Sequence, residues 1–205
     1  MSTNRWTRCR VTSGLVAALS LCVIAPGTLA GQGDAPGRKE KADDVAGFKE
    51  FSERVQKYVK LQRTVEAGLP ALTATDLPEM IAAHQQALAR KIREARPHAA
   101  EGDIFTRAAR EAFRHACLAA LGGLRSATSR AYMEPDAPNP HMRLAVNDVY
   151  PDTEPTTAFP PELLAAFPPL PAEVAYRIVG RTLIVVDVKS HLIVDVARLV
   201  LPPAS

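Results

Sequence analysis

The sequence predicts an α+β protein in which an N-terminal layer of three amphipathic helices packs on a small C-terminal, three-stranded antiparallel meander. The run 167–201 has the densest β-branched composition of the chain and is divided at Gly180-Arg181 and Lys189-Ser190, which favours three short strands. Upstream, apolar residues recur at steps of three and four, which is typical of helices with one buried face. These helices need an apolar surface to cover, and the meander provides one.

The first residues, 1–30, are expected to be a cleaved signal peptide and not part of the fold. Three arginines open this segment, and the apolar run 11–25 is short for a membrane span. Small residues before Gly31 suit cleavage after Ala30. We therefore expect a periplasmic or secreted protein with no membrane span after cleavage. The alternative is an uncleaved membrane anchor.

The leader also carries the excess charge of the chain. It holds three of the 25 basic residues and no acid, which leaves 22 basic and 22 acidic residues after cleavage. Net charge therefore gives no argument for nucleic acid or anionic lipid as a partner. Cys117 is the one cysteine outside the leader, so we expect no internal disulfide despite an oxidising destination.

Residues 31–43 are rich in glycine, proline and charge, and we expect them to be a disordered linker. Asp43 or Asp44 can then cap the first helix. The helical region spans 44–132, and its short connections favour an antiparallel bundle or layer.

Three apolar stripes define the helices of that region. The first ends near Glu66, before a glycine and a proline. The second starts from Asp76 as N-cap and ends near Arg96, because a proline follows. The third begins near Phe105 and is interrupted at Gly122-Gly123.

The connector 133–171 is crowded with proline and is expected to lie extended between the helices and the sheet. Residues 144–150 can form a brief edge strand, and 161–166 one helical turn. The meander itself is expected over 172–201, and 44–201 should form one domain.

Two-residue turns at both dividers would fix which side chains share a face of the sheet. The face toward the helices would then hold Val174, Tyr176, Ile178, Leu183, Val185, Leu192, Val194 and Val196. The outer face would hold Ala175, Arg177, Val179, Ile184, Val186, Ile193 and Asp195. Because this outer face is more apolar than a solvent-exposed sheet face usually is, we expect the connector or a partner to cover it.

Two acids occur in similar surroundings, Asp187 after Ile184-Val185-Val186 and Asp195 after Leu192-Ile193-Val194. A catalytic carboxylate pair needs both groups on one side of the sheet. In the register above they point to opposite faces, so we expect Asp187 near a strand end and Asp195 in a structural pair with Arg177.

The histidines do not form a recognised ligand pattern with one another, with cysteine or with acids. We expect no metal and no cofactor, although a metal site built from distant residues stays open. His84 lies on an apolar stripe and is expected to be a core histidine. Since no nucleophile elbow, phosphate loop or dinucleotide fingerprint occurs, no residue is a catalytic candidate.

A basic row on the third helix is the candidate binding surface, formed by Arg107, Arg110 and Arg114. This row could bind an acidic ligand or an anionic surface. The alternative is a solvated helix face that looks toward the acidic C-terminal part of the chain.

The C-terminal segment resembles that of a family of uncharacterised secreted bacterial proteins. The resemblance rests on Pro168-Pro169-Leu170-Pro171, Tyr176-Arg177, Val179-Gly180-Arg181, the two aspartate-terminated strands, Val146-Asn147 and Tyr150-Pro151. It implies bacterial export and a common fold, and it implies no activity. The tail is also similar to the end of RcnB-type periplasmic nickel/cobalt homeostasis proteins, but this chain has no His-rich tract and no metal ligand carries over.

The function that these patterns favour is a non-catalytic binding or accessory module of the bacterial envelope. Its partner would be an envelope protein or an acidic ligand, bound by the outer sheet face and the arginine row. One alternative is a hydrolase or metal-dependent enzyme with a site between helices and sheet. Another is a periplasmic metal-homeostasis protein.

Overall fold

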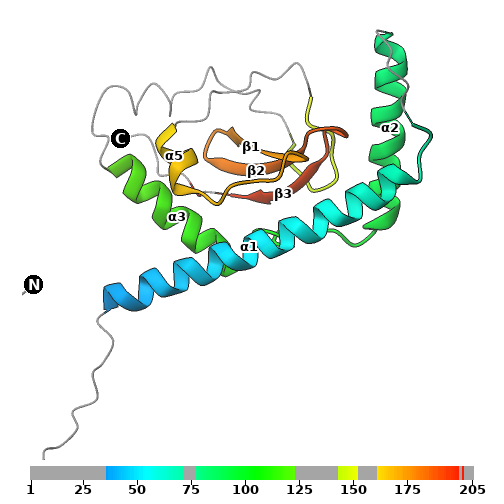
Figure 1. Cartoon of the computed structure of the whole chain (residues 1–205). Helices are drawn as coiled ribbons and strands as arrows, with labels where there is room; N and C mark the ends of the chain where they lie inside the picture. Colours follow the sequence, from blue (N-terminus) through cyan, green and yellow to red (C-terminus); the bar gives the residue numbers. More distant parts are fainter. Residues whose placement is uncertain (1–35, 72–76, 123–142, 152–160, 199, 201–205) are drawn as a thin grey trace, which may run out of the picture. The chain divides into compact units, whose positions relative to one another are not determined.

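The computed structural model describes residues 36–71, 77–122, 143–151, 161–198 and 200, and confirms the predicted α+β class (Figure 1). The elements are α1 (Pro36–Ala67), α2 (Pro78–Ala95), α3 (Arg107–Gly122), α5 (Pro161–Ala166), β1 (Val174–Val179), β2 (Thr182–Asp187) and β3 (Ile193–Ala197). The strands form an antiparallel sheet in the order β1-β2-β3. The predicted signal peptide, residues 1–30, and the predicted N-cap residue Asp76 lie outside the described residues. Among those residues, no helix has the length and apolar character needed to cross a bilayer.

The first helix begins earlier than predicted. Because α1 starts at Pro36, the prediction of a disordered linker is wrong for residues 36–43, and Asp43 and Asp44 lie inside the helix and do not cap it. Proline is tolerated in the first turn of a helix, where its missing N–H has no partner to lose. A long-range contact also supports these turns, because Asp44 lies 2.8 Å from His115 of α3.

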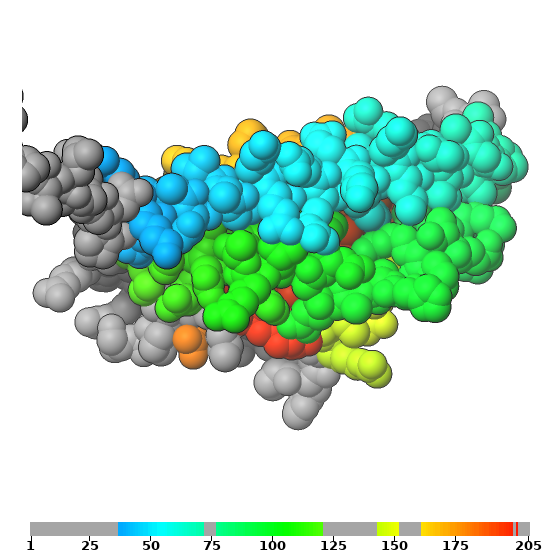
Figure 2. All heavy atoms as spheres, turned by 90° about the horizontal axis from the view of Figure 1, so that it is seen from below, coloured from blue at the N-terminus to red at the C-terminus, as the bar shows by residue number. Residues whose placement is uncertain are grey.

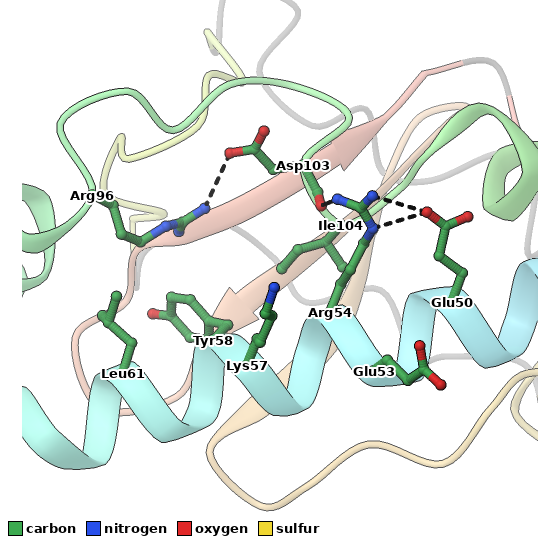
Figure 3. A pocket seen from close by; sticks show the side chains of 9 residues that line it. All are labelled: Glu50, Glu53, Arg54, Lys57, Tyr58, Leu61, Arg96, Asp103 and Ile104. Carbon is green, nitrogen blue, oxygen red and sulfur yellow. Dashed lines mark hydrogen bonds and ion pairs between the residues drawn. The ribbon is translucent and has the colours of Figure 1, made fainter.

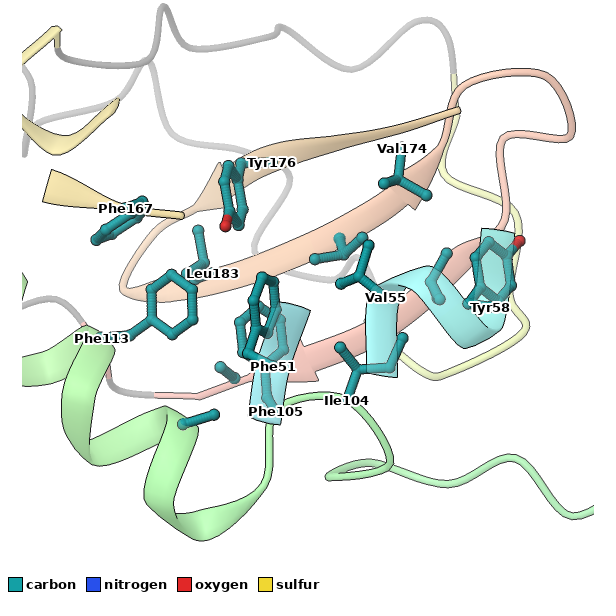
Figure 4. Close-up of a cluster of buried hydrophobic side chains, with 14 of the residues drawn as sticks. Phe51, Val55, Tyr58, Ile104, Phe105, Phe113, Phe167, Val174, Tyr176 and Leu183 are labelled. Atoms are coloured by element: carbon teal, nitrogen blue, oxygen red, sulfur yellow. The ribbon is translucent and has the colours of Figure 1, made fainter. Parts of the chain in front are cut away.

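Helices α1 and α3 cover one face of the sheet and share an aromatic core with it (Figure 4). Phe113 of α3 packs edge-on against Phe51 of α1, with 4.8 Å between ring centroids, and against Phe167 at 4.7 Å. Tyr176 of β1 joins this cluster at 5.5 Å from Phe167. Edge-to-face pairs at these separations are the favoured aromatic geometry, so the cluster fixes how the helices meet the sheet.

The backbones of α1 and α3 approach closely at Gly47. A Cβ placed there would lie 2.7 Å from the carbonyl oxygen of Ala108, a separation at which one backbone must move. Glycine is therefore required at this crossing for packing, and no local pattern around Gly47 predicts it. On the face shown in Figure 2, α1 and the green residues of α3 and the segment before it lie side by side.

The predicted register of the meander is confirmed from its first turn through the pair Val186 and Ile193 after its second, and it changes beyond that pair. Val179 pairs with Thr182 across a two-residue Gly180-Arg181 turn. Between β2 and β3, Val185 pairs with Asp195 while Val186 pairs with Ile193, so a β-bulge leaves one extra residue in β3.

The bulge reverses the alternation of side chains in the last part of β3. The predicted helix-facing set is confirmed for Val174, Tyr176, Ile178, Leu183, Val185, Leu192 and Val194. Val196 is wrongly predicted, because it pairs with Ile184 and packs in the outer cluster. Asp195 is also wrongly predicted, because it lies on the side of the helices.

Residues 143–151 cover part of the outer sheet face. Leu144 and Tyr150 are buried against Ile184 and Ile193 there. Val149 forms an isolated antiparallel bridge with Leu192, which corresponds to the brief edge strand predicted over 144–150. The outer face is therefore packed by the chain itself at these residues, and its use as a contact surface elsewhere stays a prediction.

Candidate functional site

The Asp195 carboxylate holds the segment that joins α2 to α3. Its Oδ2 accepts hydrogen bonds from the amides of Ile104 and Phe105, both at 2.7 Å, and its Oδ1 accepts one from Gly102 at 3.0 Å. Burial raises the pKa of Asp195, and the amides that donate to the carboxylate oppose that rise. The amide of Val196 also donates to Oδ1, at 2.7 Å. All four donors are backbone amides and the side chain is fully buried, so this aspartate has a structural role.

Asp187 is buried on the same side and is likewise fully engaged. Its Oδ1 accepts the amides of Lys189 and Ser190, which shapes the turn after β2, and its Oδ2 accepts the hydroxyl of Tyr58 at 2.8 Å. Burial, followed by the nearby Asp187 charge, raises the pKa of Tyr58 above its ordinary value. Tyr58 therefore stays a neutral donor.

Two predictions about these acids are wrong. Asp187 and Asp195 share the helix-facing side, because the bulge turns Asp195 over. Arg177 and Asp195 form no pair, since Arg177 lies on β1 opposite Ile184 and donates to a backbone carbonyl. The acids are nonetheless poor catalysts, because protein donors already engage the oxygens of each carboxylate.

A hollow of about 670 Å³ lies between α1 and the segment 96–104, and its charges largely neutralise one another (Figure 3). Arg54 pairs with Glu50 at 2.9 Å and donates to the carbonyl of Asp103 at 2.7 Å. Arg96 lies over the ring of Tyr58, 5.0 Å from its centroid, and donates to the carbonyl of Val194. These contacts connect α1 to the segment 96–104 and, through Arg96, to β3.

The two ends of α2 differ sharply in burial. Leu88 and Ile92 are 0 % exposed in the core, whereas Met80 is 51 % and Ile81 37 % exposed. Leu77, just before the helix, is 54 % exposed. The apolar stripe of α2 therefore continues past the core into solvent, and Figure 1 shows this half of the helix extending away from α1 and the sheet.

An apolar groove of about 810 Å³ runs beside the exposed end of α2. Its apolar lining residues are Ala67, Leu69, Pro70, Ala71, Ile81 and Val188. The charged residues at its rim are paired: Lys189 with Glu66, and Arg63 with Glu173. The hydrogen bond from Arg63 holds the pKa of Glu173 below its usual range. A ligand in this groove would therefore contact mainly apolar side chains, because the charged side chains at the rim are already paired with one another.

His84 was expected in the core, but it is only half-buried and lines this groove. The predicted basic row lies on the outside of α3. Arg107 and Arg114 are exposed, Arg110 is half-buried, and Arg107 pairs with Glu111 at 3.2 Å. Binding of an acidic partner by this row stays a prediction.

Within the described residues, no group of three metal-ligating side chains is found. Burial raises the pKa of Cys117 to about 12, which makes its thiol a poor nucleophile. Comparison with known proteins finds no match: no family model, no curated protein and no solved structure is similar to this chain. The two resemblances of the C-terminal segment therefore stay predictions.

Sequence reasoning found the stripe on α2 but missed its role. The helical spacing of apolar residues identifies the side of α2 that can be buried, but it does not show how far other elements cover that side. These residues are Leu77, Ile81, His84, Leu88 and Ile92.

Proposed function

We propose that this chain is an exported, non-catalytic binding module of the bacterial envelope, and that the N-terminal half of α2 with its groove is the contact site. The observation that carries the proposal is the exposure of Leu77, Met80 and Ile81 on a stripe whose other end forms the core. Val188, 47 % exposed on the far wall of the groove, extends the same surface.

An apolar stripe on two exposed turns of a helix is a costly feature unless something binds it. Short helices draw most of their stability from packing of an apolar face, and residues 78–87 include none that is buried. Clustered exposed apolar side chains commonly mark interaction sites. A partner that covers this stripe would continue the core of the protein.

The paired rim indicates which chemistry the partner presents. Since Lys189 and Arg63 already bind Glu66 and Glu173, a charged partner would gain little from them. An apolar segment of another exported protein, bound as a helix in the groove, fits this lining best.

Photo-crosslinking tests the contact site. We would place a photoreactive phenylalanine derivative at Met80 and, as the matched control, at Leu118, which is 46 % exposed on α3. After expression with the leader intact, illumination should give an adduct with another exported protein at Met80 and none at Leu118. The added substitution Ile81→Asp should abolish that adduct.

The outcomes separate the possible occupants. An adduct that contains two copies of this chain would assign the groove to self-association and refute the proposal of a different partner. Equal adducts at Met80 and Leu118, or none at Met80, would also contradict it. The export step is checked separately by mass spectrometry of the envelope fraction, in which the chain should begin at Gly31.

A further inference from the structure

A second hollow borders α2, between residues 82–93 of the helix and the segments 149–151 and 190–191. Its volume is about 440 Å³, which lies within the usual range for small-molecule sites. The polar residues that line it are Gln85, Gln86, Arg90, Arg93, Ser190 and His191.

The lining of this hollow differs in charge from those of the other two. No aspartate or glutamate of the described residues lines it, while two arginines do. The hollow beside Tyr58 has Glu50, Glu53 and Asp103 next to its basic groups, and the apolar groove has Glu66. Among the described residues that line these three hollows, positive charge is therefore left without a counter-charge in this one.

The two arginines are held differently. Arg93 is fixed, because its Nε donates to the carbonyl of Asn147 at 2.8 Å. Arg90 is exposed and makes no ion pair or hydrogen bond with any residue in the described part of the chain. Since they lie three residues apart on one helix, their like charges repel, and a bound anion would relieve that repulsion.

Ser190 supplies an independent sign of a ligand. Its side chain is 3 % exposed, and its Oγ has no hydrogen-bond partner among the described residues. The Ser190 hydroxyl lies close enough to that of Tyr58 to lower the Tyr58 pKa, but it forms no hydrogen bond of good geometry there, and the Tyr58 hydroxyl itself donates to Asp187. A buried hydroxyl without a partner is unfavourable, and an acceptor oxygen of a ligand would satisfy it.

The remaining wall is apolar. Ala82 and Ala89 line it from α2, and Val149 and Pro151 from the segment opposite. Such a wall would contact hydrocarbon and would not favour a bare inorganic ion. The polar and apolar parts together describe a ligand with one charged end.

We propose that this hollow binds a small organic anion, whose carboxylate or phosphate meets Arg90, Arg93 and Ser190 and whose short apolar body lies against Val149 and Pro151. Two arginines beside a hydroxyl suit either oxyanion, because guanidinium groups bind carboxylate and phosphate alike. This site is distinct from the apolar groove and does not depend on the proposed partner.

Calorimetric titration of the purified chain with butyrate, butyl phosphate, inorganic phosphate and butylamine tests the proposal. At least one butyl anion should bind several-fold more tightly than inorganic phosphate, and butylamine should not bind. The tighter of the two butyl anions identifies the head group.

Matched variants show whether the site is the one proposed. Arg90→Gln should weaken binding of the tighter anion about tenfold, the usual worth of one charge-assisted hydrogen bond. Lys60→Gln removes the same charge from an exposed lysine of α1 that lines none of the three hollows and should leave affinity unchanged. Ser190→Ala should weaken binding about threefold without lowering the melting temperature.

Three results would overturn the proposal. The first is the absence of heat with both butyl anions at millimolar concentration. The second is an equal loss of affinity in Arg90→Gln and Lys60→Gln, which would indicate attraction to overall charge. The third is binding of inorganic phosphate as tight as that of the tighter butyl anion, which would leave an adventitious ion only.

Discussion

The two halves of α2 belong to different environments although they share one apolar stripe. In the C-terminal half, Leu88 and Ile92 are fully buried, and Arg93 and the C-cap residue Arg96 donate to backbone carbonyls of other segments. In the N-terminal half, no residue of 78–87 is buried. Periodicity therefore identifies the apolar side of a helix, while the extent of the neighbouring elements decides how much of it is covered.

This contrast extends to polar groups. On the core side, buried acids are engaged by protein donors, as Asp195 is by three amides of the 102–105 segment. In the hollow along residues 82–93 of α2, Arg90 has no ion pair or hydrogen bond among the described residues, and the Ser190 hydroxyl makes no hydrogen bond of good geometry. Substitutions on the core side should therefore affect stability, and substitutions in this hollow or on the projecting half should affect binding.

The largest effect is expected from Asp195→Ala. Three amides of the 102–105 segment and the amide of Val196 would lose their acceptor, and we expect the free energy of unfolding to fall by about 3–5 kcal/mol. Chemical denaturation measures the loss. Asp148→Ala is the control, because that half-exposed acid lies 4.0 Å from Arg143 and should change stability by less than about 0.5 kcal/mol. Similar losses in both variants would refute the role given to Asp195.

Gly47→Ala should come next. The new methyl group would meet the backbone of Ala108, and overpacking of this kind costs about 2 kcal/mol. Gly37→Ala, in the same helix with nothing within 4 Å, should be neutral or slightly stabilising. Thermal unfolding of the two variants compares them directly, and a harmless Gly47→Ala would show that α1 and α3 are not in close contact.

Tyr58→Phe should cost about 1.5 kcal/mol at neutral pH, because Asp187 loses a buried donor. It should also change the response to alkali. The folded-state pKa of Tyr58 is raised, so its contribution is complete below about pH 10 and declines above it as the unfolded chain ionises. Wild-type stability should then fall more steeply than that of Tyr58→Phe, by about 1.4 kcal/mol per pH unit. Parallel curves from denaturation between pH 9 and 11 would contradict this.

The smallest effect is expected from Met80→Ala on the projecting half. Because Met80 is 51 % exposed, its truncation should change stability by less than about 0.5 kcal/mol. Leu88→Ala, on the same stripe but 0 % exposed, should lose about 2–5 kcal/mol. Comparable losses in denaturation would show that the stripe is covered along its whole length.

The sequence predicted the fold class, the order of helices and strands, and most of the helix-facing sheet residues. It failed at β3, because a bulge at Val194 depends on how two strands pair and leaves no local pattern. It also failed at residues 36–43, where contacts between Asp44 and His115 support a helix that local composition disfavours. The exposed half of α2 could not be predicted, since it reflects where the covering elements end.

Amide hydrogen exchange along α2 in the isolated chain measures whether the N-terminal half of this helix is open. We expect a division within the helix, with slow exchange at 88–95, where the side chains reach the core, and fast exchange at 82–87, where they do not. Uniform slow exchange along the whole of α2 would mean that its N-terminal half is already covered, and it would contradict an open contact site there.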